Sequence, residues 1–214
     1  MIKTVIFDLD GTLLNTLEDL KDSTNFALSQ FGFPIRTIEE IRSFVGNGVK
    51  VLIERAVPAG CDDETIEKCL AIFKENYSKN MYNHTKPYNS IKEILTILRE
   101  KGLKIGVVSN KFDSAVKELC NLYFENLIDI AIGQADDVPK KPAPDGVFKA
   151  MKKLNTDKFS TVYVGDSEVD VATAKNAELP CIGVTWGFRD KKDLAGAEYI
   201  IDEPTKLLET IGRM

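Results

Sequence analysis

The stretch Thr4–Thr12 (TVIFDLDGT) decides the fold, because an apolar, β-branched run leads straight into two carboxylates and a glycine. Such an uninterrupted run is typical of a strand buried on both faces of a parallel sheet. Side chains alternate along a strand, so Asp8 and Asp10 share one side if the backbone stays extended between them. Gly11 then allows the chain to turn away.

These acids are therefore expected at the carboxyl end of a buried strand, where open α/β sheets bind their ligands. Two crowded carboxylates are unstable there unless a cation or a shared proton offsets their charge. A hard divalent cation is the simplest partner. Taken alone, an Asp-x-Asp-Gly sequence is equally typical of a turn or a helix N-cap, so the rest of the chain has to decide between these interpretations.

The overall composition is that of an ordinary globular chain. It has 214 residues, 43% hydrophobic content and a formal net charge of −5, which suits one large domain or one domain with a smaller insertion. The negative charge argues against nucleic acid or an anionic membrane as the main partner. A small anionic substrate is compatible with it, provided that lysines, a metal or helix N-termini supply local positive charge.

The cysteines and the hydropathy pattern indicate the compartment. No apolar run approaches the roughly 20 residues that a membrane span requires, and the N-terminus begins a strand rather than a signal peptide. The four cysteines lack the Cys-x-x-Cys spacing of zinc sites and indicate reduced thiols; they are Cys61, Cys69, Cys120 and Cys181. We expect a soluble, cytoplasmic monomer or homodimer that binds neither membrane nor nucleic acid.

His84 is the single histidine of the chain, and this restricts the catalytic chemistry. A serine-histidine-acid triad would have to use it, and sites built on two or three histidines are excluded. It lies in a polar connector, residues 82–87, just before a proline, so we expect no catalytic role for it. General acid and base catalysis therefore falls to carboxylates.

Between residues 15 and 85 the sequence predicts helices and no strand. Apolar residues recur at helical spacing, and Thr37 with Glu40 forms a capping box for the second helix. The expected helices are residues 17–28, 38–44, 49–57 and 64–81.

From Ser90 onward strands alternate with helices. Ser90 and Glu93 predict a second capping box, and the helix that follows ends at Gly102, a typical glycine after a helix C-terminus. Further expected strands are 103–108, 128–132, 161–164, 181–184 and 199–201, with helices at 114–122, 145–154, 168–177 and 205–211.

This alternation predicts an α/β fold with a doubly wound, Rossmann-like parallel sheet and right-handed crossovers. The first strand belongs to that sheet, so the helical segment is an insertion between its first two strands. We expect a core of residues 1–14 and 86–214, and a helical cap of residues 15–85 over the carboxyl ends of the strands.

Polar residues follow the expected strand ends. Ser109 and Asn110 come after the second strand, and Asp166 with Asp170 after the fourth, while Lys141 lies in a proline-rich loop between the third and the fourth. Singly, these residues are more typical of turns, of a helix N-cap or of a solvated lysine. Because parallel strands end at one edge of a sheet, the four loops deliver carboxylates, a hydroxyl, an amide and an ammonium to one cleft.

In this order the motifs resemble the haloacid dehalogenase superfamily of phosphatases. Asp8-Leu9-Asp10-Gly11-Thr12 stands as the first motif, Ser109-Asn110 as the second, Lys141 as the third and Gly165-Asp166-Ser167 through Asp170 as the fourth. In that family a helical insertion after the first motif marks members with a small cap. Looser features are similar to the phosphoglycolate phosphatases: Val45-Gly46-Asn47-Gly48, Ser109-Asn110-Lys111, Lys141-Pro142-Ala143-Pro144-Asp145 and Thr185-Trp186-Gly187-Phe188.

The resemblance implies a Mg²⁺-dependent phosphomonoester hydrolase that acts through an aspartyl-phosphate. Asp8 would be the nucleophile, and Asp10 would protonate the leaving oxygen and then take a proton from water. Mg²⁺ would be held by Asp8, the backbone carbonyl of Asp10 and Asp166. Asp170 would act through a water molecule or by holding Lys141.

The resemblance also implies the groups that bind the substrate, a small phosphorylated metabolite. The Ser109 hydroxyl, the Asn110 backbone amide and Lys141 would hold the phosphoryl oxygens. Thr12 would help to fix Asp10. For specificity we consider a loop before an expected helix, whose amides can bind an anion; its residues are Gly46, Asn47 and Gly48.

That loop is equally well explained as an interhelical turn. Two further residues are considered for the cleft, and for both a simpler role is favoured. Arg55 could supply a second cation, although a solvated arginine is more typical. Trp186 could line the mouth of the cleft, although covering the sheet edge is more typical.

A signalling receiver domain is the main alternative outside the enzymes, since it also places an aspartate, magnesium, a hydroxyl and a lysine on a doubly wound sheet. It resembles the chain less well, because its aspartate follows the third strand, where Gly133 and Gln134 stand here. Among enzymes, a pyrophosphatase, a sugar-phosphate or nucleotide phosphatase, or a β-phosphoglucomutase-like phosphomutase would use the same core. Haloacid dehalogenation is disfavoured by Asp10 and the fourth motif.

Overall fold

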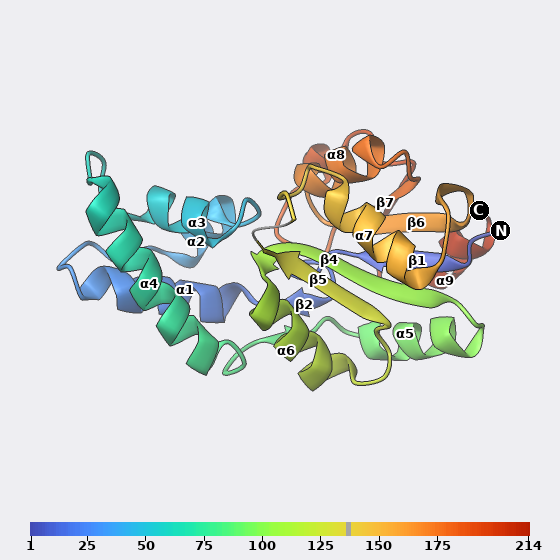
Figure 1. Ribbon diagram of the computed structural model, residues 1–214, viewed down its shortest axis with the longest axis horizontal. Helices are drawn as coiled ribbons and strands as arrows, with labels where there is room; N and C mark the ends of the chain where they lie inside the picture. Colours follow the sequence, from blue (N-terminus) through green and yellow to red (C-terminus); the bar gives the residue numbers. More distant parts are fainter. Residues whose placement is uncertain (136–137) are drawn as a thin grey trace.

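The computed structural model describes residues 1–135 and 138–214. Figure 1 shows a sheet flanked by helices and, beside it, four helices from the N-terminal half of the chain. We call these four the helical group; they are α1 (Leu17–Ser29), α2 (Ile38–Phe44), α3 (Val49–Ala56) and α4 (Asp63–Asn80). None of the helices in the described residues is long and apolar enough to cross a membrane.

In the part of the chain that the structure describes, the main sheet has six strands in the order β5-β4-β1-β6-β7-β8, and every neighbouring pair is parallel. The expected doubly wound α/β fold is therefore confirmed. β1 lies in the middle and is buried over its whole length, as its apolar run predicts. The strands are β1 (Thr4–Phe7), β4 (Lys104–Phe112), β5 (Ile130–Gln134), β6 (Thr161–Gly165), β7 (Cys181–Val184) and β8 (Tyr199–Ile201).

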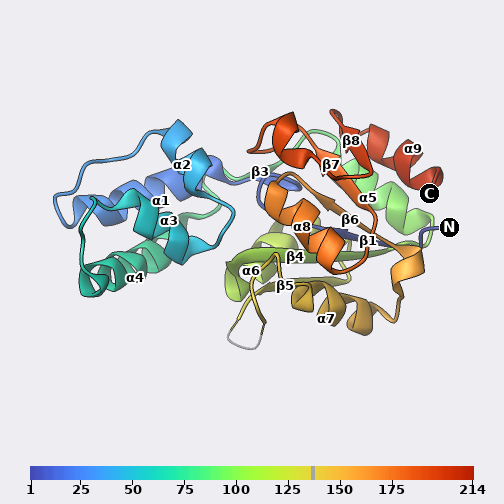
Figure 2. The ribbon, with the colours of Figure 1, turned by 90° about the horizontal axis from the view of Figure 1, so that it is seen from above.

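Helices cover both faces of this sheet (Figures 1 and 2). One face carries α5 (Ile91–Glu100), α6 (Asp113–Phe124) and α9 (Lys206–Gly212), and the other carries α7 (Asp145–Leu154) and α8 (Glu168–Asn176). Two short 3₁₀ helices are η1 (Lys158–Ser160) and η2 (Lys191–Leu194). The carboxyl ends of β4 and β5 point toward the helical group, whereas both chain termini lie at the opposite end (Figure 1).

Buried apolar side chains continue from the sheet into the helical group without a break. One cluster contains Val5 and Phe7 of β1 together with Leu20, Leu52 and Phe73 of the helical group. Burial of such side chains is the main source of stability, so the two parts are held against each other by a shared apolar core.

Two very short strands were not expected. β2 (Leu14–Asn15) pairs antiparallel with β3 (Lys86–Pro87) where the chain leaves and re-enters the main sheet region. The expectation of no strand from residue 15 to 85 was therefore wrong at Asn15. A two-residue strand has no periodicity to detect, and only the approach of the two connecting segments creates it.

The returning connector is anchored from both sides. The buried carboxylate of Asp19, in α1, accepts hydrogen bonds from the backbone N–H groups of His84 (3.0 Å) and Thr85 (2.8 Å). The Tyr123 hydroxyl, in α6, donates to the Thr85 carbonyl at 2.7 Å. The connector is thus bonded to the helical group and to the sheet region at once.

The expected capping boxes had different outcomes. Thr37 and Glu40 form both reciprocal hydrogen bonds at the start of α2, as predicted. Ser90 does not cap α5, because its backbone is left-handed with φ 62° and its side chain makes no capping hydrogen bond. The second box was therefore wrong, while Gly102 ends the helix with φ +78°, as expected.

Candidate active site

Three carboxylates meet at the carboxyl edge of the sheet. Asp8 follows β1, Asp166 follows β6, and Asp170 lies in the first turn of α8. One oxygen of each lies within 4.8 Å of the others, and all three side chains are buried. Asp8 and Asp166 come together because β1 and β6 are paired in register, with Phe7 opposite Val164.

Burial dominates the electrostatics of this cluster. It raises the pKa of Asp8 to about 7, with the Asp170 carboxylate adding to the effect and Lys141 opposing it. Burial also raises the pKa of Asp166 well above its ordinary range, helped by the charges of Asp170 and Asp8. Carboxylates this close together repel each other when all of them are ionised. A hard divalent cation binds such oxygens and offsets their charge. The residues of this cluster therefore fit such an ion.

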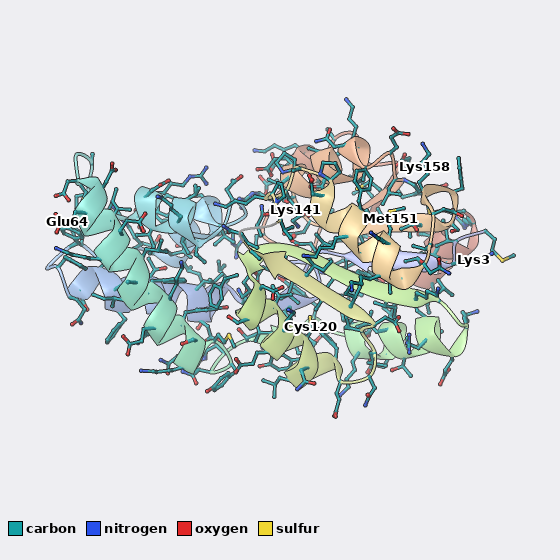
Figure 3. All side chains as sticks on the ribbon, viewed as in Figure 1. Lys3, Glu64, Cys120, Lys141, Met151 and Lys158 are labelled. Atoms are coloured by element: carbon teal, nitrogen blue, oxygen red, sulfur yellow. The ribbon has the colours of Figure 1, made fainter. Side chains whose placement is uncertain are left out.

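Lys141 enters the cluster from the loop before α7. Its Nζ lies 2.8 Å from Asp8 Oδ1 and 2.7 Å from Asp170 Oδ1, and it donates to the Tyr163 hydroxyl at 3.1 Å. Burial acts to lower the pKa of Lys141, but Asp170 and Asp8 outweigh it and raise that pKa well above its ordinary range. Figure 3 shows Lys141 at the end of the sheet region that faces the helical group. Lys141 is therefore no solvated surface lysine.

The side chain of Asn110 holds the backbone of Lys141. Asn110 Oδ1 accepts from the Lys141 N–H at 2.8 Å, and Asn110 Nδ2 donates to the Lys141 carbonyl at 3.1 Å. Ser109 and Asn110 lie inside β4 rather than after it, because the pairing with β5 shifts between Val108 and Phe112. Irregular pairing of this kind changes where side chains point.

Asp170 has both carboxylate oxygens occupied by protein groups. Oδ1 accepts from Lys141 and from the Tyr163 hydroxyl at 3.1 Å, and Oδ2 accepts from the N–H and hydroxyl of Ser167 at 3.1 and 2.6 Å. Ser167 is also the N-cap of α8. The N-cap interpretation of this motif is therefore confirmed, and Asp170 is also placed to hold Lys141.

Glycines allow the carboxylates to approach the backbone. A Cβ on Gly187 would lie 2.4 Å from the Cβ of Asp166, and one on Gly11 would lie 2.3 Å from Asp166 Oδ2. A Cβ on Gly165 would likewise lie 2.3 Å from the Cβ of Asp170. Gly11 also has φ +87°, as its predicted turn requires. Gly187 was not expected in this role, since only the folding of its loop onto Asp166 reveals it.

Asp10 has partners that differ from those predicted. Its Oδ1 accepts from the Thr16 hydroxyl at 2.7 Å, and both of its oxygens lie 3.0 Å from Lys111 Nζ. The Lys111 ammonium also lies 4.6 Å from the centroid of the Tyr77 ring, in α4. No role was predicted for Lys111 from the sequence. Its position could have indicated one, because it directly follows Asn110 of the second motif and lies before the apolar residue that ends β4.

Thr12 lies elsewhere than expected. Its side chain is fully buried and donates to Asp166 Oδ1 at 3.1 Å, so Thr16 rather than Thr12 fixes Asp10. The Trp186 indole donates to the Thr12 carbonyl at 3.0 Å, which places Trp186 against the first motif. The turn at Gly11 explains this difference, because it places the Thr12 side chain next to Asp166 instead of Asp10.

A small cavity of about 50 Å³ lies above these groups, room for a few water-sized groups. Its floor contains the catalytic candidates Asp8 and Asp10, with Lys141 and Ser109. Its roof is mostly apolar and comes from the helical group and from the loop between α2 and α3; it is formed by Leu20, Val45, Gly46, Gly48, Val49 and Leu52. The cavity therefore joins a charged floor to an apolar roof.

The loop considered for specificity is divided between two cavities. Gly46 and Gly48 line the small cavity, and the Gly46 carbonyl accepts from Asn110 Nδ2 at 3.0 Å. Asn47 lines a separate polar groove together with Arg55. Arg55 donates to backbone carbonyls at the end of α2 and does not reach the small cavity.

His84 stands apart from the catalytic candidates. Its side chain is 54% exposed, and its Nε2 lies 3.8 Å from the Asp22 carboxylate. It is not among the residues that line the cavity. The four cysteines are free thiols, as expected, and three of them are buried.

Comparisons with known proteins identify the family. A family model described as haloacid dehalogenase-like hydrolase matches residues 5–184. A phosphoglycolate phosphatase of Pseudomonas savastanoi pv. phaseolicola is 33% identical over 215 residues, covering 96% of this chain and 78% of that protein. One of Colwellia psychrerythraea is 32% identical over 220 residues, covering 99% and 97%.

A solved structure gives the same result for the fold. The protein from Lactobacillus delbrueckii subsp. bulgaricus, assigned as a phosphoglycolate phosphatase, matches with a TM-score of 0.92 at 35% identity, covering 98% of each chain. With these matches the resemblance found in the motifs is confirmed: the chain belongs to the haloacid dehalogenase-like hydrolase family and is a phosphatase.

Proposed function

We propose that the chain is a Mg²⁺-dependent phosphomonoester hydrolase that acts through an aspartyl-phosphate and prefers phosphoglycolate. The observation that carries the proposal is the position of Asp8, which lies on the floor of a small cavity between Asp166 and the Lys141 ammonium. We further propose that residues 15–85, which contain the helical group, form the cap domain that closes this cavity.

Asp8, the backbone carbonyl of Asp10 and Asp166 would hold the Mg²⁺ ion. When bound, it supplies positive charge between a carboxylate and a phosphate that otherwise repel each other. Asp170 supports this site indirectly, since its oxygens are bonded to Lys141, Tyr163 and Ser167.

In the first half of the reaction an Asp8 oxygen forms a bond to phosphorus while the ester P–O bond breaks. Asp10 gives its proton to the leaving oxygen. The Ser109 hydroxyl, the Asn110 backbone amide and the Lys141 ammonium bind the phosphoryl oxygens as charge moves onto them. In the second half water attacks phosphorus, Asp10 takes its proton, and Asp8 is released as a carboxylate.

The substrate proposal rests on the size of the cavity and on the relatives. The small cavity suits a phosphorylated acid of very few carbons, and its roof includes Gly46 and Gly48, whose loop precedes α3. Two relatives at 32 to 33% identity carry the name phosphoglycolate phosphatase. Pyrophosphate, sugar phosphates and nucleotides are the competing substrates, and a phosphomutase is the competing activity.

A substrate panel with Mg²⁺ tests the proposal. We expect the highest kcat/KM for phosphoglycolate, and loss of turnover on addition of EDTA. Asp8→Asn should lower kcat by at least about 10⁴-fold, since it removes the nucleophile, while Asp63→Asn, an exposed matched control, should keep wild-type rates. Appreciable turnover by Asp8→Asn would show that the nucleophile is misassigned.

A further inference from the structure

Three cations line the cavity among residues 1–135 and 138–214, namely Lys111, Lys141 and Arg189. Lys141 is bound between Asp8 and Asp170 and serves the phosphoryl end of the site. The other two are the candidates for a second anionic group on the substrate.

The side chain of Arg189 is already bonded to protein groups where the sheet region meets the helical group. Its guanidinium donates to the backbone carbonyls of Arg42, at 2.6 Å, and Val45, and lies 3.4 Å from the Glu168 carboxylate. These carbonyls belong to the C-terminal end of α2, where cations are stabilising. Arg189 therefore acts mainly as a link between the two parts of the fold.

Lys111 has the properties of a binding residue. Its side chain is 1% exposed, and Asp10 accepts from two of the three donors of its ammonium. The ring of Tyr77 covers the same ammonium, and Tyr77 itself is fully buried. Water is largely excluded at such a site, so an anion that reaches it interacts more strongly than it would in solvent.

The position of Lys111 relative to Asp10 indicates which part of the substrate it meets. If Asp10 protonates the leaving oxygen, Lys111 lies one hydrogen bond from the point where the carbon part of the substrate begins. In phosphoglycolate a single methylene separates that oxygen from the carboxylate, so the carboxylate comes within reach of an ammonium that sits about 3 Å from Asp10. The roof opposite is apolar at Leu20, Val49 and Leu52.

We propose that Lys111 is a specificity-determining residue, which binds the carboxylate of a small phosphorylated acid beside Asp10. This inference rests on the proposed function and adds a fixed cation to it. The loop at Gly46 lies against the same strand through Asn110 Nδ2, so its amides and the Lys111 ammonium surround the substrate carboxylate together.

The test compares phosphoglycolate with ethyl phosphate, which has a similar size and no carboxylate, using the full chain and MgCl₂. In Lys111→Met we expect the ratio of the two kcat/KM values to fall by about 10- to 100-fold, the usual effect of losing one charge-assisted contact. Lys111→Arg should retain most of the preference. Arg189→Met removes another cation from the cavity lining. It should change kcat/KM by the same factor for both substrates. Lys111→Gln repeats the comparison if Lys111→Met does not fold, as judged by thermal unfolding.

The outcomes separate this inference from the proposed function. An equal loss on both substrates in Lys111→Met would make Lys111 a positioning residue for Asp10 and would overturn the inference. Loss of the preference in Arg189→Met alone would also overturn it, as would a wild-type enzyme that treats the two substrates alike. A wild-type protein that hydrolyses no phosphomonoester would instead refute the proposed function.

Discussion

At the scale of single residues, the two aspartates of the first motif differ in their buried lysine partners. Asp8 lies 2.8 Å from Lys141, whereas Asp10 lies 3.0 Å from Lys111. Lys141 is shared with Asp170, but Asp10 is the carboxylate paired with Lys111 among the described residues. The two carboxylates therefore lie in different electrostatic environments although one residue separates them.

The hydrogen bonds of Asp170 predict how it contributes to Mg²⁺ binding. In Asp166→Asn the concentration of Mg²⁺ that gives half-maximal activity should rise strongly, because a proposed direct ligand is lost. In Asp170→Asn that concentration should rise less, while kcat falls about 10- to 100-fold because Lys141 loses its main anchor. Titrations of activity with Mg²⁺ measure both effects; equal rises in the two variants would mean that Asp170 binds the ion directly.

The packing at Gly187 gives a second prediction. Gly187→Ala should lower kcat/KM at least about 10-fold and destabilise the fold by about 1–3 kcal/mol, because its Cβ would overlap Asp166. Gly212→Ala is the matched control, since a Cβ there meets nothing within 4 Å. Kinetics and urea unfolding of both variants check this, and a fully active Gly187→Ala would contradict the packing argument.

At the scale of elements, the connectors between the sheet region and the helical group are more ordered than their composition suggests. β2 pairs with β3, and Asp19 binds the backbone of the returning connector next to them. A buried carboxylate that accepts backbone N–H groups stabilises the turn it holds. The two connectors are therefore parts of one structured junction.

Asp19 allows this junction to be tested. Asp19→Asn should lower the free energy of unfolding by about 2 kcal/mol, because an amide group cannot accept the three N–H···O contacts as well as a carboxylate. Asp22→Asn, one turn further along α1 and half exposed, should change it by less than about 0.5 kcal/mol. Urea unfolding distinguishes the two, and similar effects would refute the special role of Asp19.

At the scale of the whole molecule, contacts between the sheet region and the segment that holds the helical group surround the cavity. Tyr77 covers Lys111, Arg189 bonds to the end of α2, and Asn110 bonds to the Gly46 carbonyl. Together with the shared apolar core, these contacts describe a closed arrangement around a small cavity. The size of that cavity is therefore set jointly by the two parts of the fold.

Global stability should depend on Mg²⁺ and pH together. In the metal-free protein the pKa of Asp8 is raised to about 7 and that of Asp166 is also raised, so the folded state binds more protons than the unfolded state. The contribution of Asp8 and Asp166 to the free energy of unfolding is therefore present below pH about 4 and is lost as pH rises toward 7. We expect Mg²⁺ to raise the Tm more at pH 8 than at pH 5.

Thermal unfolding with and without MgCl₂ at the two pH values measures this difference. Asp8→Asn serves as the control, because it removes one of the titrating carboxylates and should reduce the pH dependence of the Mg²⁺ effect. A stabilisation by Mg²⁺ that is equal at both pH values would contradict the electrostatic account of the cluster.

Most of the fold could be predicted from periodicity. The run before Asp8 predicted a central buried strand, and the alternation after Ser90 predicted the parallel sheet, because burial on both faces leaves a continuous apolar pattern. The predictions failed where local sequence carries no such pattern: at the capping box of Ser90, at the ends of β4 and in the two-residue strands β2 and β3.

The sequence by itself determined the order of the elements and the motifs at the strand ends, since both follow from local patterns of residue type. Only the tertiary structure decided the partners: Lys111 beside Asp10, Thr12 under Asp166, and Gly187 against the same carboxylate. These contacts join residues up to 154 positions apart. They depend on how loops approach one another across the sheet edge, and no spacing along the chain records that approach.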